Sequence, residues 1–453
     1  MRRLLFALLC WVLVIAPASA SILLLGAGSG AGGAPAPPTG NCAESTAFFA
    51  RSGTMAAPSL TAYDTMICGL VSDATWSKLD VLRIYAAPTT AIAALNLVSS
   101  SYNATINGSP TFTANLGFTG VDASTTTYLD SGFNPTTAPS AKFVQNSAHV
   151  AIWQTTSVVN ANPFWGASNG STIAAWVLRS SADNFNYIRI NGSATSGGSA
   201  GTATTTDGQV IASRTANNIV GLYKNGIFVA NTGVYNSAGV SNLNFYELGH
   251  NASGTAQGSA PAQMAVHWGS GLSAAESFSV YNRVRTYLIA IAGISGWQTA
   301  YTQNLISNNT GWNGRTLRNV MAATNTYNGT QVRVTLSPSS GATMTIDAAY
   351  MGHAAVAGDA YDFDGTQVQI TFNGGSTGFV AAINTPQVSD AMTYTYDRTK
   401  NFIISVHFSA VSATRSANNA PGYYKDAVNE AGTTDVTGYT TTQTIMVSKV
   451  EVQ

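Results

Sequence analysis

The feature that most limits how this chain can fold is a long series of short apolar runs separated by turn-forming residues. From about Tyr102 onward, runs such as Ala148 to Gln154 and Asn218 to Tyr223 alternate with Asn-Gly, Gly-Ser and Asn-Pro pairs. Runs this short and closely spaced are typical of strands, because helices need longer periodic segments. We therefore predict a mainly β protein built from antiparallel β-sandwiches.

Two local signals sharpen this prediction for the central region. Asn225-Gly226 lies between two apolar runs, and this pair readily takes the positive φ values of a type I′ hairpin turn. Ser273 and Glu276 have the spacing of a capping box, followed by apolar residues at helical spacing and then by Gly293. We expect a hairpin at the first site and a helix from Ser273 to Ala292 at the second.

A second β-rich block follows. Val332 to Leu336, Met392 to Tyr396 and Phe402 to Phe408 show period-two alternation, and Ile445 to Val452 is typical of a closing strand. We predict one sandwich over residues 104–295, a linker over 296–310 and a second sandwich over 311–453.

The N-terminal end is different in composition. Residues 1–20 have the charged start, apolar stretch and Ala18-Ser19-Ala20 site of a secretory signal. Residues 21–45 are rich in Gly, Ala and Pro and indicate a flexible tether. In the alternative interpretation, Ser21 to Gly33 is the apolar, Gly-rich start of a phage structural protein.

Residues 46–103 indicate a short helical collar. Apolar residues from Leu60 to Leu70 recur at helical spacing after Pro58. Thr75 is placed to cap a second helix that carries Trp76, Leu79 and Leu82, and a third helix is expected over Thr90 to Val98. Cys42 and Cys68 would pair as a disulfide in an oxidising compartment, and the alternative is two buried free thiols.

Charge excludes one class of partner. Lys plus Arg number 20, Asp plus Glu number 20, and only 9% of residues are charged. No basic stripe is available to neutralise phosphates, so we expect no nucleic-acid partner. The surface must instead be built largely from Ser, Thr, Asn and Gly, which suits uncharged, hydroxyl-rich partners.

Several short motifs of the central block together resemble the laminin-G-like, concanavalin-type jelly roll. The resemblance covers about Ala104 to Ile291, and its motifs are Gly117 to Gly120, Tyr128 to Pro135, Lys224 to Gly226, Tyr246 to Gly249 and Leu272 to Glu276. With Trp76 to Asp80, the block is similar to proteins encoded in phages and prophages of α-proteobacteria. The final block is similar, more loosely, to β-sandwich modules that accompany esterase or lectin modules in phage proteins.

One catalytic motif of related enzymes is missing from the sequence. The Glu-x-Asp-x-Glu strand of concanavalin-type glucanases does not occur. We therefore expect a protein that is not an enzyme and that needs no cofactor. Asp359, Asp362 and Asp364 cluster before Gly365, where a solvated acidic turn is the simpler interpretation and a Ca²⁺ site the alternative. Whether a metal binds is left open.

Binding is the expected role, and aromatic residues are its candidates because sugars stack on flat rings. Trp165 lies in a loop-like context near Asn169, so this pair is the predicted carbohydrate contact, with packing under a loop as the alternative. Trp153 lies inside an apolar run and is expected in the core. Trp297 and Trp312 lie between the two blocks.

These observations favour an extracellular or virion-surface protein, such as a tail or head fibre, that attaches to host glycans or other cell-surface polymers. In this hypothesis the N-terminal segment binds virion proteins and the chain is a homo-oligomer. The alternatives are a secreted bacterial lectin or adhesin, a decoration subunit without a ligand, and a degenerate polysaccharide-degrading enzyme.

Overall fold

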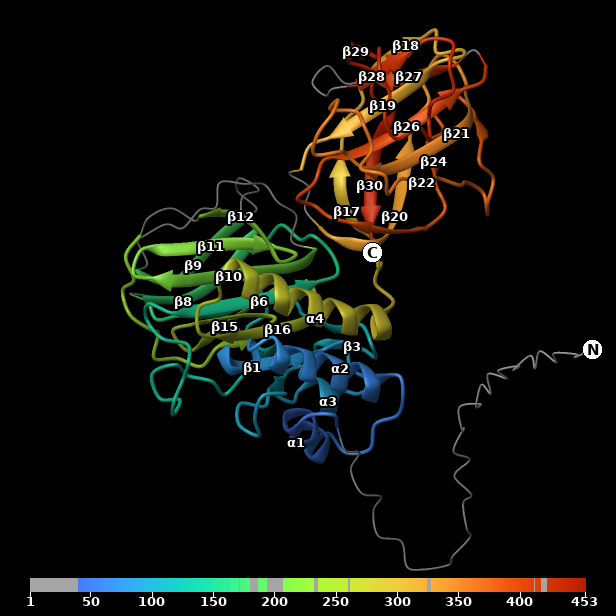
Figure 1. Cartoon of the computed structure of the whole chain (residues 1–453). Helices are drawn as coiled ribbons and strands as arrows, with labels where there is room; N and C mark the ends of the chain where they lie inside the picture. The colour runs from blue at the N-terminus through green and yellow to red at the C-terminus, as the bar shows by residue number, and fades with distance from the viewer. Residues whose placement is uncertain are drawn as a thin grey trace, which may run out of the picture. The chain divides into compact units, whose positions relative to one another are not determined.

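The computed structural model describes residues 40–453 except 161, 171, 180–185, 194–206, 232–234, 260, 324–326, 411 and 417–421. The signal-like segment 1–20 and most of the tether 21–45 therefore lie outside the described residues. The described chain is mainly β with a few helices, as predicted (Figure 1). No helix in this part of the chain combines the length and apolar character that a bilayer crossing requires.

The central sandwich consists of two large sheets. Sheet 1 has the order β12-β11-β10-β6-β16-β4-β3, and β1 also pairs with β16. Its strands are β1 (Leu79–Ile84), β3 (Thr111–Thr113), β4 (Gly117–Thr119), β6 (Ala148–Gln154), β10 (Gly208–Ala216), β11 (Ile219–Lys224), β12 (Ile227–Asn231) and β16 (Ala262–Gly269).

Sheet 2 has the order β15-β14-β7-β13-β5-β2, and β8 joins β7 to β9. Its strands are β2 (Thr105–Asn107), β5 (Tyr128–Asp130), β7 (Trp165–Ser168), β8 (Thr172–Arg179), β9 (Asn186–Ser193), β13 (Tyr246–Glu247), β14 (Gly249–Ala252) and β15 (Thr255–Gly258). Its pairs are antiparallel except β14 with β7. Aromatic rings fill the space between the sheets: Trp165 of sheet 2 lies 5.2 Å from Trp268 of sheet 1, centroid to centroid.

Helix α4 (Ala274–Ala292) covers the outer face of sheet 1 (Figure 1). It begins and ends as predicted, because Ser273 and Glu276 form the capping box and Gly293 adopts the left-handed conformation at its end. Helix α2 (Ser59–Ser72) packs beside it, with the rings of Tyr63 and Tyr287 4.6 Å apart. The helix predicted after Pro58 is therefore confirmed.

The helical collar needs correction. Leu79–Ile84 is not helical: after a 3₁₀ turn (η1, Trp76–Lys78) it forms β1, which pairs antiparallel with β16. A short apolar run fits the periodicity of a helix and that of a strand equally well. Pairing with a strand that is distant in the sequence decides which of the two forms. The helix expected over Thr90 to Val98 is only α3 (Thr90–Ala93), and an additional helix, α1 (Ala43–Ser52), was not predicted.

The C-terminal sandwich has two main sheets and a two-stranded ribbon. Sheet 3 contains β17 (Gln298–Thr302), β20 (Gly329–Leu336), β24 (Gln387–Val388), β25 (Met392–Tyr396) and β30 (Val447–Val452). Sheet 4 contains β19 (Thr316–Met321), β21 (Met344–His353), β22 (Val368–Gln369), β23 (Phe379–Ala381), β26 (Phe402–Phe408), β28 (Gly422–Lys425) and β29 (Thr440–Thr442). The ribbon pairs β18 (Ser307–Thr310) with β27 (Ala413–Ser416).

Two of these strands lie in the expected linker. Residues 296–310 include β17, which pairs with β30, and β18, which pairs with β27. Their Thr-, Gln- and Asn-rich sequences lack apolar alternation, so no strand was visible in the pattern. The predicted closing strand does form, as β30, between β17 and β20.

Candidate functional site

A cavity of about 460 Å³ opens where the end of β6 meets α4 and the segment that follows α4. It lies within the compact unit Pro38–Gln453. Its lining comes from the ends of β6 and β10, the β11–β12 turn, the middle of α4 and residues 294–299, with Tyr327 beyond them. Sheet, hairpin, helix and connecting segment thus all contribute to one site.

The Asn-Gly hairpin forms one side of this cavity. Asn225 and Gly226 have φ values of 50° and 76°, as the type I′ turn requires. The Asn225 side-chain oxygen accepts from the backbone N–H of Gln209 at 2.9 Å, and the Asn225 N–H donates to the carbonyl of Gln209 at 2.8 Å. These two bonds tie the turn to the start of β10, which fixes Asn225 at the cavity.

Aromatic rings form the wall beside α4. Trp153 stacks on Tyr281 with a centroid distance of 5.4 Å and an interplanar angle of 5°. The Tyr281 hydroxyl accepts from the Gln298 side-chain amide at 2.9 Å. Trp153 and Tyr281 are buried, whereas Trp297 is half-buried, with the Arg333 guanidinium 4.6 Å from its ring centroid. Trp297 is therefore the tryptophan of the cavity with surface left for a ligand.

Gln154 stands out among the polar lining residues. It is 2% exposed, and neither atom of its side-chain amide hydrogen-bonds to any group in the part of the chain that the structure describes. Leaving a buried amide unpaired costs about 1–3 kcal/mol. Both amide atoms have less than 1 Å² of accessible surface, so a partner from outside the chain, either a water molecule or a ligand hydroxyl, reaches them only when the surrounding side chains move.

Two charged groups line the same cavity. Asp207 pairs with Lys224 at 3.7 Å. Arg285 lies on α4 and donates to the backbone carbonyl of Gly296, and burial lowers its pKa while nearby Tyr281 and Tyr327 raise it. Burial likewise raises the pKa of Tyr281, so this hydroxyl stays protonated at neutral pH. The polar groups of the cavity are thus hydroxyls and amides with one spare cation.

A larger cavity, of about 590 Å³, lies between α4 and the end of α2. Its charged groups satisfy one another: Arg283 donates to both carboxylate oxygens of Asp73 at 2.8 and 2.9 Å, and Ser279 donates to the same carboxylate. Glu276 caps the helix and pairs with Lys78 at 3.3 Å. This cavity is larger than the one beside β6 and α4, but its charged groups are already paired with one another, so it is the weaker candidate for a binding site.

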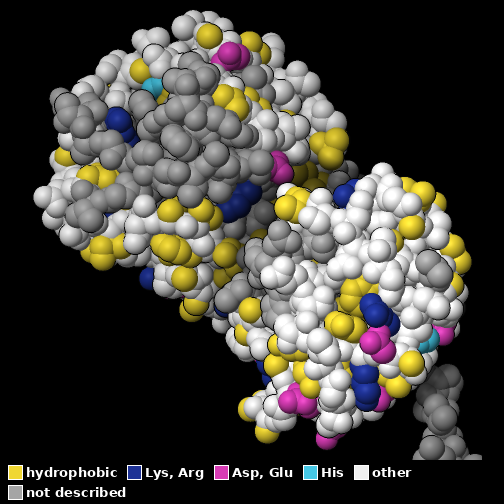
Figure 2. Space-filling view, turned by 90° about the horizontal axis from the view of Figure 1, so that it is seen from above, with side chains coloured by type: hydrophobic (Ala, Val, Ile, Leu, Met, Phe, Trp, Pro, Cys, Tyr) yellow, Lys and Arg dark blue, Asp and Glu magenta, His cyan; other side chains and the backbone are white. Residues whose placement is uncertain are grey.

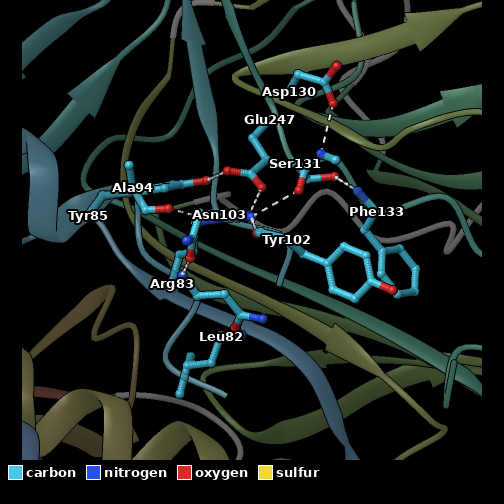
Figure 3. Close-up of polar contacts among 12 residues, drawn as sticks. Leu82, Arg83, Tyr85, Ala94, Tyr102, Asn103, Asp130, Ser131, Phe133 and Glu247 are labelled. Atoms are coloured by element: carbon cyan, nitrogen blue, oxygen red, sulfur yellow. Dashed lines mark hydrogen bonds and ion pairs between the residues drawn. The ribbon is translucent and has the colours of Figure 1, made fainter. Parts of the chain in front are cut away.

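The fully buried ion pair of the central sandwich is closed to ligands. Arg83 and Glu247 form an ion pair with both side chains fully buried, and the Tyr85 hydroxyl donates to the same carboxylate (Figure 3). Arg83 also donates to the carbonyls of Tyr102 and Ser131. Burial raises the pKa of Glu247 and Arg83 opposes that rise. The cluster connects β1, β13 and the loops beside them, which is a structural role.

The predicted carbohydrate contact at Trp165 needs correction. Its ring has no exposed surface and packs against Phe245 and Trp268, so a sugar cannot stack on it. The ring takes the alternative role that the sequence left open, which is packing. Asn169 is exposed at the β7–β8 turn.

The other predicted residues can also be placed. Cys42 and Cys68 are bonded through their sulfur atoms, with Cα atoms 5.7 Å apart. Asp362 accepts from the backbone N–H groups of Asp359 and Val436, and Asp364 accepts from Thr366. Within the described ranges, no three His, Cys, Asp or Glu side chains are grouped to hold a metal ion.

Sequence reasoning missed most of the cavity. Trp153 was correctly expected to be buried and Trp297 was noted between the two blocks, but Gln154, Tyr281 and Arg285 were not singled out. Gln154 ends an apolar strand, and a polar residue in that position is a weak signal. Tyr281 and Arg285 are four residues apart on a helix, hence on one face, which is common in helices of every function.

No family model matches the chain, and no curated protein matches it. Three solved structures illustrate the similarities found. Domain 4 of AbnA, an extracellular arabinanase from Geobacillus stearothermophilus solved with arabinotriose, is 10% identical over 45% of this chain and 98% of that one, with a TM-score of 0.32. Trypanosoma rangeli sialidase, solved with sialic acid, is 12% identical over 47% of this chain and 34% of that one, with a TM-score of 0.34.

The third, the binding domain of Paraclostridial Mosquitocidal Protein 1, is 9% identical over 77% of this chain and 75% of that one, with a TM-score of 0.33. This chain spans about a third of the sialidase. Identities and TM-scores this low support no inference about what this chain binds. The fold described above rests on the structure itself.

Proposed function

We propose that this chain is a non-catalytic carbohydrate-binding protein and that the cavity beside β6 and α4 holds the sugar. The observation that carries the proposal is the unpaired, buried amide of Gln154 in a cavity that also offers the half-buried ring of Trp297. Sugars combine hydroxyl groups, which pair with amides, and apolar ring faces, which stack on aromatic rings. A purely apolar ligand fits this lining less well.

The lining also supports a role without catalysis. Among the described residues that line the cavity, Asp207 is the sole carboxylate, and it pairs with Lys224. Glycoside hydrolysis by the usual route requires two carboxyl groups that flank the bond. We therefore propose binding alone.

We further propose that binding serves attachment to glycans on a cell surface, as a virion fibre or a secreted lectin. The signal-like start of the sequence and the bonded pair Cys42 and Cys68 support an exported setting, because disulfides persist in oxidising compartments. The surface is also poor in charge: Figure 2 shows charged side chains sparse and scattered among uncharged ones. Several copies acting together would raise a weak affinity per site.

A glycan array probed with the full chain in multivalent form tests this proposal. We expect binding to a subset of glycans, and Trp297→Ala should weaken it by at least about tenfold, or about 1.4 kcal/mol. Phe228→Ala is the matched control, because Phe228 is an exposed aromatic residue on β12 outside the cavity lining. Absence of binding to every glycan, or equal loss in both variants, would contradict the proposal.

A further inference from the structure

Arg285 is paired differently from five other described arginines, Arg83, Arg214, Arg283, Arg318 and Arg333. Arg83, Arg283 and Arg333 each form an ion pair with a carboxylate. The interior arginines Arg214 and Arg318 each donate to three or more backbone carbonyls. Each of these guanidinium groups is therefore neutralised or largely satisfied within the chain.

Arg285 donates to the carbonyl of Gly296, and no carboxylate of the described residues lies within ion-pair distance of it. A guanidinium has five N–H donors, so most of its donors remain available. It is half-buried in the cavity lining, and Tyr281 lies one helical turn before it. The cation and the aromatic wall thus share one face of α4.

The charges of the cavity do not cancel. Asp207 is paired with Lys224, which leaves Arg285 as the unbalanced charge among the described lining residues. A partly desolvated cation without a counter-ion is unfavourable, and burial accordingly lowers the pKa of Arg285. A bound anion would relieve this cost, and a carboxylate matches the planar fork of a guanidinium through two parallel hydrogen bonds.

Building on the proposed function, we infer that the sugar held in this cavity is an acidic one, whose carboxylate pairs with Arg285 while its ring and hydroxyl groups contact Trp297 and Gln154. This refines the expectation from composition, which pointed to uncharged partners. Binding should accordingly weaken as salt is raised, because the pair is only half-buried.

Two matched probe pairs test the inference by titration of the full chain. One pair is trigalacturonate and its methyl ester, and the other is 3′-sialyllactose and lactose, so that charge is the main difference within each pair. We expect at least one acidic probe to bind at least about tenfold more tightly than its neutral partner. In Arg285→Gln that preference should disappear, and Arg285→Lys should recover only part of it.

Arg398→Gln is the control for loss of a positive charge, because Arg398 is exposed on a turn of the C-terminal sandwich. It should leave the preference unchanged. Equal binding of both members of each pair, or an acidic preference that survives in Arg285→Gln, overturns the inference and leaves the proposed function standing. The inference is also overturned if none of the four probes binds and the chain binds only neutral glycans on the array. If no glycan on the array binds, the proposed function itself is contradicted.

Discussion

Polar residues inside the central sandwich differ in how completely they are paired, and the differences separate structure from function. Arg83 and Glu247 satisfy each other and need no ligand. His149, His267 and Gln209 form a hydrogen-bonded chain across three strands of sheet 1. Gln154, at the cavity, has neither amide atom paired within the described chain. An unpaired buried group that lines a cavity is the residue-scale signature of a binding site.

This contrast gives a prediction for Gln154. Gln154→Leu removes an unpaired amide from a buried position, so we expect the free energy of unfolding to rise by about 1–2 kcal/mol. Glycan binding should weaken at the same time, because the amide that pairs with a hydroxyl is gone. Denaturant unfolding and glycan titration of the same preparation measure both effects. A variant that is less stable and binds normally would show that Gln154 is a structural residue.

The histidine chain gives a prediction about acid stability. The Ser270 carbonyl can only accept, so His149 donates to it through Nδ1 at 2.5 Å and accepts at Nε2 from His267 Nδ1 at 2.9 Å. His267 Nε2 in turn lies 3.1 Å from the Gln209 amide nitrogen and accepts from it. This arrangement requires two neutral rings, and burial lowers the pKa of His149 to about 4 and that of His267 further.

Both rings thus have a lower pKa in the folded chain than in the unfolded chain, so folding favours their neutral forms. Their contribution to stability is complete above about pH 6.5 and is lost as pH falls toward 4, on the order of 3 kcal/mol for His149. Urea unfolding at several pH values should show this loss. His149→Gln, which cannot titrate, should show a shallower fall, and an identical fall in both proteins would contradict the assignment.

At the element scale, sequence signals predicted the structure correctly where residues close together in the sequence determine the conformation. Asn225-Gly226 requires only its own φ values, and the Ser273 capping box requires only the first turn of its helix. Leu79–Ile84 could not be assigned in the same way, because its partner β16 lies far along the sequence. Trp165 and Trp297 illustrate the same limit for the site, because the sequence does not show which of the two rings is buried. Contacts with Phe245 and Trp268 bury the ring of Trp165, whereas Trp297 remains half-buried.

The hairpin turn gives an element-scale prediction. A Cβ added at Gly226 would lie 3.0 Å from Cβ of Tyr281, and its φ of 76° strains any L residue. Gly226→Ala should therefore cost more than about 2 kcal/mol, from the left-handed conformation and from crowding against α4. Gly254→Ala is the control: its φ is also positive, but no atom lies within 4 Å of the added Cβ, so it should cost about 1 kcal/mol. Equal costs in denaturant unfolding would show that the turn does not press on α4.

At the scale of the whole molecule, a zero formal charge conceals one local imbalance. Twenty positive and twenty negative side chains cancel overall, and composition therefore predicts a neutral partner. The fold leaves Arg285 without an acidic partner in the described chain, beside Trp297 and Gln154 in one cavity. The mainly β fold could be predicted from periodicity, whereas this imbalance arises only when α4 packs on sheet 1.

The central claim is that a sugar binds in the cavity beside β6 and α4. The most direct measurement is a crystal structure of the chain with the tightest-binding oligosaccharide from the array. The account predicts a sugar ring against Trp297, a hydroxyl group within hydrogen-bond distance of the Gln154 amide, and a carboxylate on Arg285. Density for the sugar at any other surface, with this cavity holding water alone, would contradict it.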